Sequence, residues 1–141
     1  MLRNAFVFTA ALFALSAVPI ESSAQNPLAG IWRGSLAVNG MSCQDDRTIS
    51  PTGTYSEVLR CGPYATSQTG TYRSFPNNTV SFVVQSFAPT RRYVQDTGYT
   101  GHWENNATPP GGTFRYTLPN ANTLVFRDAN LGGTITYHRL R

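Results

Sequence analysis

Two closely similar stretches constrain the fold of this chain most strongly. The first runs from Gly70 to Val84 and the second from Gly112 to Phe126; each opens on Gly-Thr-aromatic-Arg and carries Pro-Asn near its middle. Proline fixes φ and asparagine tolerates the left-handed conformation that a chain reversal needs, so each stretch predicts two strands joined by a turn. An isolated hairpin is only marginally stable in water, so both must share a core with neighbouring strands. The repeat therefore predicts an all-β domain.

The same period of two residues recurs elsewhere in the chain. Apolar side chains alternate from Trp32 to Val38, and the Asn39-Gly40 pair that follows is a strong hairpin signal. The remaining strands are expected at Met41 to Ile49, Thr54 to Arg60, Tyr64 to Phe75, Thr79 to Phe87 and Thr134 to Leu140.

About eight short strands joined by tight turns favour an antiparallel up-and-down meander. An open meander of this length exposes two edges, and closing it into a barrel removes them. We therefore expect a closed β-barrel, with a two-sheet β-sandwich as the alternative architecture.

The first residues predict a secretory signal peptide at positions 1–24. Arg3 supplies a positive start, an apolar run follows from Ala5 to Val18, and Ser22-Ser23-Ala24 offers small residues for cleavage. The run is short for a membrane anchor, which is the alternative. We expect an exported protein, periplasmic or secreted, with one domain at 25–141 and no membrane span in the mature chain.

Cysteine usage agrees with export. The chain holds 2 cysteines, Cys43 and Cys61, and an even number in an oxidising compartment predicts a disulfide. A redox pair or a metal site is the alternative, but the chain has no Cys-x-x-Cys spacing and no histidine close to either cysteine. We expect no metal and no cofactor.

The segment from Ala88 to Gly111 is the least regular part of the chain. It predicts a long loop with a short strand at Tyr99 to Glu104, and ordered long loops often carry function. Arg91, Arg92, His102 and Glu104 are the candidate residues for a partner surface here. His102 and Glu104 share a face of the expected strand, and we interpret them as a solvated pair.

The two ends of the mature chain carry a resemblance. Gly30-Ile31-Trp32 and a late arginine resemble the signature of the lipocalins and the wider calycin group. The resemblance implies a barrel whose base is closed by the tryptophan, with an arginine packed over its ring. Arg139 or Arg141 is that arginine, and parity with Tyr137 favours Arg139. The chain is also similar to compact exported lipocalin-like barrels of bacteria, a group that includes inhibitors of secreted metalloproteases.

Motifs for catalysis are not found in the sequence. It contains no Gly-x-Ser-x-Gly, phosphate-binding loop or metal-binding histidine pair, so we expect no enzyme. Asp45 and Asp46 point to opposite faces of a strand, and we interpret them as a solvated pair near a turn. The 11 basic residues are all arginines and are spread singly except at Arg91-Arg92, which argues against a nucleic-acid interface.

Aromatic residues carry the remaining functional signal. Those on the faces expected to point inward either fill the barrel or line a cavity for one small, largely apolar ligand. With Arg139 to orient a polar end, the candidate ligand-binding residues are Trp32, Tyr72, Phe82, Phe114, Tyr116, Phe126 and Tyr137. The hypotheses are a non-enzymatic binding protein, a protein-interaction module such as an inhibitor of a secreted hydrolase acting through Ala88 to Gly111, and a filled barrel with a structural role.

Overall fold

The computed structural model describes residues 26–141, so the expected signal peptide at 1–24 lies outside the described residues. The described part contains strands only, which are β1 (Gly30–Val38), β2 (Met41–Ile49), β3 (Thr54–Cys61), β4 (Tyr64–Phe75), β5 (Thr79–Ala88), β6 (Arg91–Thr97), β7 (Thr100–Asn105), β8 (Gly112–Asn120), β9 (Thr123–Asp128) and β10 (Thr134–Arg139).

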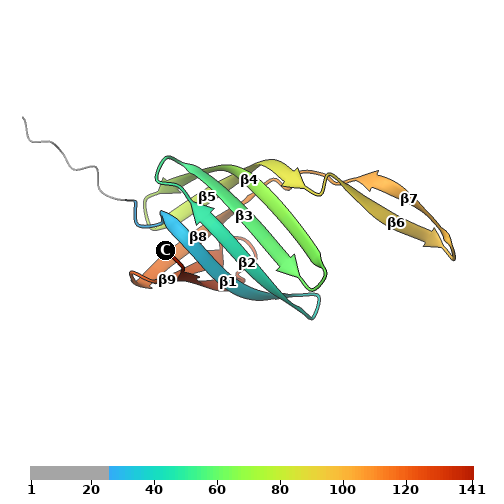
Figure 1. Ribbon diagram of the computed structural model, residues 1–141. Helices are drawn as coiled ribbons and strands as arrows, with labels where there is room; N and C mark the ends of the chain where they lie inside the picture. Colours follow the sequence, from blue (N-terminus) through green and yellow to red (C-terminus); the bar gives the residue numbers. More distant parts are fainter. Residues whose placement is uncertain (1–25) are drawn as a thin grey trace, which may run out of the picture.

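Eight of these strands form a closed antiparallel barrel in the order β1-β10-β9-β8-β5-β4-β3-β2, while β6 and β7 form a separate two-stranded sheet. Figure 1 shows the barrel with the β6–β7 hairpin extending away from one end. Closure depends on β1, which pairs with β2 on one side and with β10 on the other. The expected all-β barrel is confirmed, and the sandwich alternative is excluded.

Asparagine-rich turns set the strand register. Asn39 and Gly40 join β1 to β2 with φ of 49° and 76°, as a two-residue hairpin turn requires. Asn77 and Asn78 are also left-handed, with φ of 64° and 53°, and join β4 to β5. The second repeat differs, because β8 continues to Asn120 through an irregularity in its pairing with β9 that accommodates a proline.

The expectation of a long loop at Ala88 to Gly111 is wrong, but the short strand expected within it at Tyr99 to Glu104 is confirmed as β7. Most of the segment forms the β6–β7 hairpin, in which Arg91 pairs with Asn105 and Tyr93 with Trp103. Asn106 fixes the root of the hairpin, since its side-chain amide donates to the Pro89 carbonyl at 2.7 Å. Because β5 and β8 pair directly with each other, the hairpin is an insertion between two adjacent barrel strands.

Cys43 and Cys61 face each other across β2 and β3 and form a disulfide with an S–S distance of 2.05 Å. The bridge confirms the expected pairing. It lies near the end of the barrel from which the β6–β7 hairpin extends, here called the hairpin end. The opposite end, where the chain enters β1 and leaves β10, is called the base.

The part of the barrel toward the base is packed with aromatic rings. Phe82 lies at the centre of this core, with the rings of Tyr55, Phe114 and Phe126 at centroid distances of 4.8, 6.0 and 5.8 Å. The buried members of the core are Leu28, Trp32, Ile49, Tyr55, Tyr72, Val80, Phe82, Leu124, Phe126 and Tyr137. Burial of these apolar surfaces is the main driving force for closing the sheet.

A tryptophan and an arginine close the base. The guanidinium of Arg139 lies 4.1 Å from the centroid of the Trp32 ring, a cation–π contact. The same guanidinium donates to the carbonyls of Ala29 at 2.7 Å and Ala121 at 2.8 Å. It fits because Gly30 has no side chain to collide with it. The expected stacking by Arg139 is confirmed.

Replacing this arginine tests the closure of the base. Arg139→Ala should lower the free energy of unfolding by about 2 to 4 kcal/mol, because it removes the cation–π contact and charge-assisted hydrogen bonds. Arg141→Ala is the matched control, since this exposed side chain lies at the same end. Chemical denaturation measures both, and equal losses in the two variants would contradict a special role for Arg139.

Candidate functional site

The interior of the barrel contains charged groups on the side of the aromatic core that faces the hairpin end. Inward positions on β2 alternate along Cys43, Asp45, Arg47 and Ile49, and all four are buried. Asp45 and Arg47 have exposed fractions of only 2 and 6%. Burying charge in this way is costly unless partners compensate it, so the surrounding strands must supply them.

Arg47 is the centre of this charged group. Its guanidinium donates to Glu57 on β3 at 2.7 Å and to Asp45 at 3.4 Å. Its guanidinium carbon lies over the Phe82 ring at 4.9 Å from the centroid. Glu57 in turn accepts a hydrogen bond from the Gln68 side chain on β4 at 2.7 Å. We call Asp45, Arg47, Glu57, Tyr55 and Tyr137 the polar belt.

Tyr137 reaches the belt from β10 across a gap left by glycine. Gly34 on β1 pairs with Asp45 on one side and with Tyr137 on the other. A Cβ at Gly34 would lie 2.9 Å from the Tyr137 ring, closer than such atoms pack. The missing side chain lets the ring cross β1, and the Tyr137 hydroxyl donates a hydrogen bond to Asp45.

Burial also changes the acidity of the belt. Loss of hydration raises the pKa of Asp45 to about 6, with Glu57 adding to the rise and Arg47 opposing it. Burial likewise raises the pKa of Tyr137, so its hydroxyl stays protonated as the donor to Asp45. Asp45 is therefore a carboxyl group that changes charge just below neutral pH.

Three buried polar atoms of the belt are left without partners. Asp45 Oδ1, Arg47 Nε and the Tyr55 hydroxyl have no hydrogen-bond partner among the described residues. Buried polar atoms are nearly always paired, so each unpaired one requires an explanation. Here all three residues line the same cavity.

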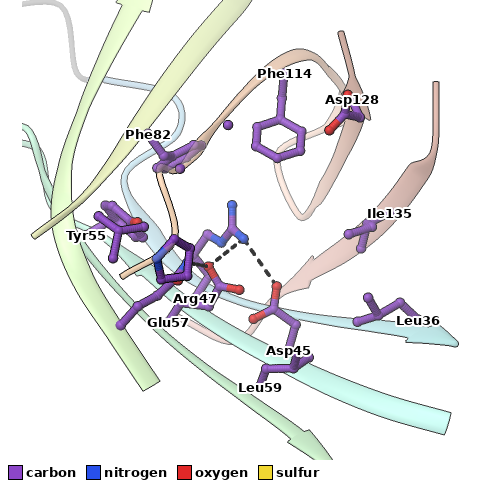
Figure 2. A pocket seen from close by; sticks show the side chains of 15 residues that line it. Leu36, Asp45, Arg47, Tyr55, Glu57, Leu59, Phe82, Phe114, Asp128 and Ile135 are labelled. Atoms are coloured by element: carbon purple, nitrogen blue, oxygen red, sulfur yellow. Dashed lines mark hydrogen bonds and ion pairs between the residues drawn. The ribbon is translucent and has the colours of Figure 1, made fainter. Parts of the chain in front are cut away.

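The cavity lies between the polar belt and the hairpin end and has a volume of about 280 Å³. Figure 2 shows Arg47 at its centre, between Asp45 and Glu57, with Phe82 and Phe114 on one side and Leu36 and Ile135 on another. The segment that returns from the β6–β7 hairpin adds Pro109 and Gly111 to the wall. Apolar walls with a few convergent polar groups are typical of small-molecule sites.

The candidate ligand residues from the sequence are divided among several places. Phe82 and Phe114 line the cavity. Phe126 packs against both rings, and Tyr116 packs against the core. Trp32 and Arg139 close the base, and Tyr72 is bonded there to the Ser50 carbonyl at 2.6 Å. Tyr137 touches the belt through its hydroxyl.

The expectation that Asp45 and Asp46 form a solvated pair is correct for Asp46 and wrong for Asp45. Asp45 and Asp46 do point to opposite faces, but only Asp46 lies on the outer surface, where it binds Arg33 at 2.7 Å and Arg60 at 2.9 Å. Asp45 lies inside the barrel because it shares the inward face of β2 with Cys43, Arg47 and Ile49.

Sequence reasoning missed Asp45, Arg47, Glu57 and Tyr55 as site residues. The alternation of side chains along the strand was the available signal. Cys43 and Ile49 are apolar and point to one face of β2, and Asp45 and Arg47 lie between them on that same face.

The β6–β7 hairpin has two different faces. Tyr93 and Trp103 pack edge to face with ring centroids 5.6 Å apart, and Arg91 lies over the Trp103 ring at 5.7 Å. Arg92 and Glu104 form an ion pair at 3.0 Å on the opposite face. The candidate partner residues are therefore split, with Arg91 on the aromatic face and the other three on the charged face.

His102 sits between two carboxylates on the charged face. Its ring nitrogens lie 3.0 Å from Glu104 and 2.9 Å from Asp96. The hydrogen bonds to Asp96 and Glu104 raise the pKa of His102. His102 and Glu104 are both exposed, which confirms that they form a solvated pair sharing a face.

Within residues 26–141, no group of three or more His, Cys, Asp or Glu side chains is arranged to hold a metal ion. The same part of the chain contains no helix long and apolar enough to cross a membrane. Comparison of the sequence with protein-family models and with curated proteins gives no match. The structure itself shows an eight-stranded closed antiparallel barrel and a contact between Trp32 and Arg139.

The raised pKa of Asp45 predicts an unusual dependence of stability on pH. A carboxyl group whose pKa rises from 3.8 to about 6 on folding stabilises the fold when protonated, and this contribution disappears as pH rises through that interval. Relative to Asp45→Asn, the unfolding free energy of the wild type should fall by about 3 kcal/mol between about pH 3.5 and about pH 7.

Asp46→Asn is the matched control for this measurement. Hydrogen bonding to Arg33 lowers the pKa of Asp46, so its contribution to stability is present above the unfolded pKa and is lost as pH falls. Urea unfolding across the pH range should therefore give slopes of opposite sign for the two comparisons. The same sign for both would show that Asp45 is not buried as described.

Proposed function

We propose that the protein is an exported, non-enzymatic binding protein of lipocalin-like type that holds one small molecule in the cavity above its polar belt. The observation that carries the proposal is that three residues lining one cavity, Asp45, Arg47 and Tyr55, each carry a buried polar atom without a partner. A ligand with an apolar body and a polar end pairs these atoms and covers the apolar walls, which removes two energetic costs together.

The size of the cavity restricts the ligand. A volume of about 280 Å³ is just below the usual range for small-molecule sites, roughly 300 to 1,000 Å³. The aromatic core fills the barrel below the belt, so the ligand is held near the hairpin end and does not extend along the barrel axis. This favours a compact molecule with one ring or a short chain over a long lipid.

A second candidate function involves the β6–β7 hairpin. Tyr93 and Trp103 keep exposed fractions of 53 and 59%, although they pack on each other, and Tyr99 at the tip is fully exposed. Aromatic residues and arginine are enriched where proteins bind other proteins. The aromatic face therefore supports a role as an interaction arm, such as one that inhibits a secreted hydrolase.

Blocking the cavity tests the first function. Val84 lines the cavity, and its neighbour Val83 points outward with an exposed fraction of 54%. Native mass spectrometry of the protein from its own compartment should show an extra mass that disappears on denaturation. Val84→Trp should lose it, because the larger side chain occupies the cavity, whereas Val83→Trp should keep it. An extra mass that survives in both variants, or is missing from the wild type, would contradict cavity binding.

Adjacent arginines on opposite faces test the second function. Arg91→Glu should reduce inhibition of a secreted hydrolase from the same source at least tenfold, because it places a carboxylate beside the Trp103 ring. Arg92→Glu changes charge equally but on the other face, and should retain inhibition. Enzyme assays against secreted proteases and glycosidases measure both variants, and equal behaviour of the two would exclude the aromatic face as the contact surface.

A further inference from the structure

The charges around the cavity restrict the class of ligand further than its size does. The lining contains the carboxylates of Asp45, Glu57 and Asp128 and a single guanidinium, that of Arg47. The whole chain, in contrast, has a formal net charge of +4. The cavity is therefore negatively charged in a positively charged protein.

Arg47 does not remove this excess. It is already bonded to both Glu57 and Asp45, so one positive charge serves two carboxylates. An anionic ligand placed here would meet two carboxylates that compete for the same guanidinium. At low dielectric this repulsion is much stronger than in water.

Two of the three unpartnered atoms are acceptors that belong to residues of the cavity wall. Asp45 is 2% exposed, and its Oδ1 has no donor among the described residues, since Tyr137 and Arg47 both bind the other oxygen. Tyr55 is 4% exposed, and its hydroxyl oxygen is an additional acceptor in the same wall. A primary ammonium group has three donors and no acceptor, so it matches two such acceptors.

We propose that the cavity binds a small organic cation, an ammonium group on a compact aromatic or alkyl body, with the ammonium at Asp45 Oδ1 and the Tyr55 hydroxyl and the body against Phe82 and Phe114. This inference rests on the small-molecule function proposed above and adds the class of ligand. Arg47 Nε, the third unpartnered atom, is a donor and is suited to a neutral oxygen on the ligand body.

A proton competes with such a cation. Burial raises the pKa of Asp45 to about 6, so uptake of either a proton or an ammonium group reduces the negative charge of the belt. The titratable or charged groups that line the cavity with Asp45 are Arg47 on β2, Tyr55 and Glu57 on β3 and Asp128 on β9, and Tyr137 on β10 bonds Asp45 directly. The wall positions on the other four strands carry no charge: Leu36 on β1, Gln68 on β4, Phe82 and Val84 on β5, and Gly112 and Phe114 on β8.

The charge preference of the cavity is tested with three probes of nearly equal shape: benzylammonium, benzyl alcohol and benzoate. Titration of the purified protein, followed by NMR at about pH 7.5, should show benzylammonium binding at least tenfold more tightly than either other probe. The affinity for benzylammonium should fall about tenfold at about pH 5, where Asp45 is mostly protonated, while the affinity for benzyl alcohol stays constant.

Two variants locate the ammonium group. Asp45→Asn should lose the preference for the cation and its pH dependence but still bind benzyl alcohol. Tyr55→Phe removes only a hydroxyl without a partner, so the protein should fold, and benzylammonium should bind about fivefold more weakly. Its pH dependence should remain, since Asp45 is unchanged, which keeps the inference testable if Asp45→Asn does not fold.

The outcomes distinguish a failure of the proposed ligand class from a failure of the small-molecule function. Binding of benzyl alcohol or benzoate as tightly as benzylammonium would overturn the cation and leave the cavity as a small-molecule site. A cation preference that is unaffected by pH and by both variants would overturn the placement at Asp45. If none of the three probes shifts the signals of the cavity residues, the small-molecule function itself fails.

Discussion

The buried charge of Arg47 is the constraint on which the interior of this barrel depends. A guanidinium does not lose its proton under ordinary conditions, so the surrounding strands must compensate it. Glu57 pairs with it from β3, and Asp45 pairs with it from its own strand. Tyr137 reaches Asp45 from β10 only because Gly34 leaves a gap on β1. The barrel is consequently divided into a packed aromatic part between Arg47 and the base and a partly open part between Arg47 and the hairpin end.

The base of the barrel was predictable because its signals are local. Asn39-Gly40 specifies a tight turn, and the alternation from Trp32 to Val38 specifies which side faces the core. The same parity argument that placed Arg139 on the Trp32 side depends only on counting residues along one strand. Features of this kind need no knowledge of the neighbouring strands, and the structure contains them as expected.

The polar belt and the first strand of the hairpin, β6, were not predicted, for different physical reasons. Charged residues are normally solvated, and this general rule favours a solvated Asp45 although parity with Cys43 places it inside. Its partners are Arg47 on the same strand and Tyr137 on β10, and no local pattern reveals a partner on a distant strand. The hairpin has no core of its own, so β6 lacks the apolar alternation that identifies strands, and only β7 was expected. Cross-strand contacts, such as those of Tyr93 with Trp103 and Arg92 with Glu104, accompany their pairing instead.

The position of the hairpin has a consequence for how such a protein can diverge. It leaves the barrel after β5 and returns at β8, and these two strands are already neighbours in the closed sheet. Lengthening, shortening or exchanging the arm therefore leaves the order and register of the eight barrel strands unchanged. Related chains can evolve new arms on a constant barrel, and an engineer can graft a different recognition segment between Ala88 and Gly112 in the same way.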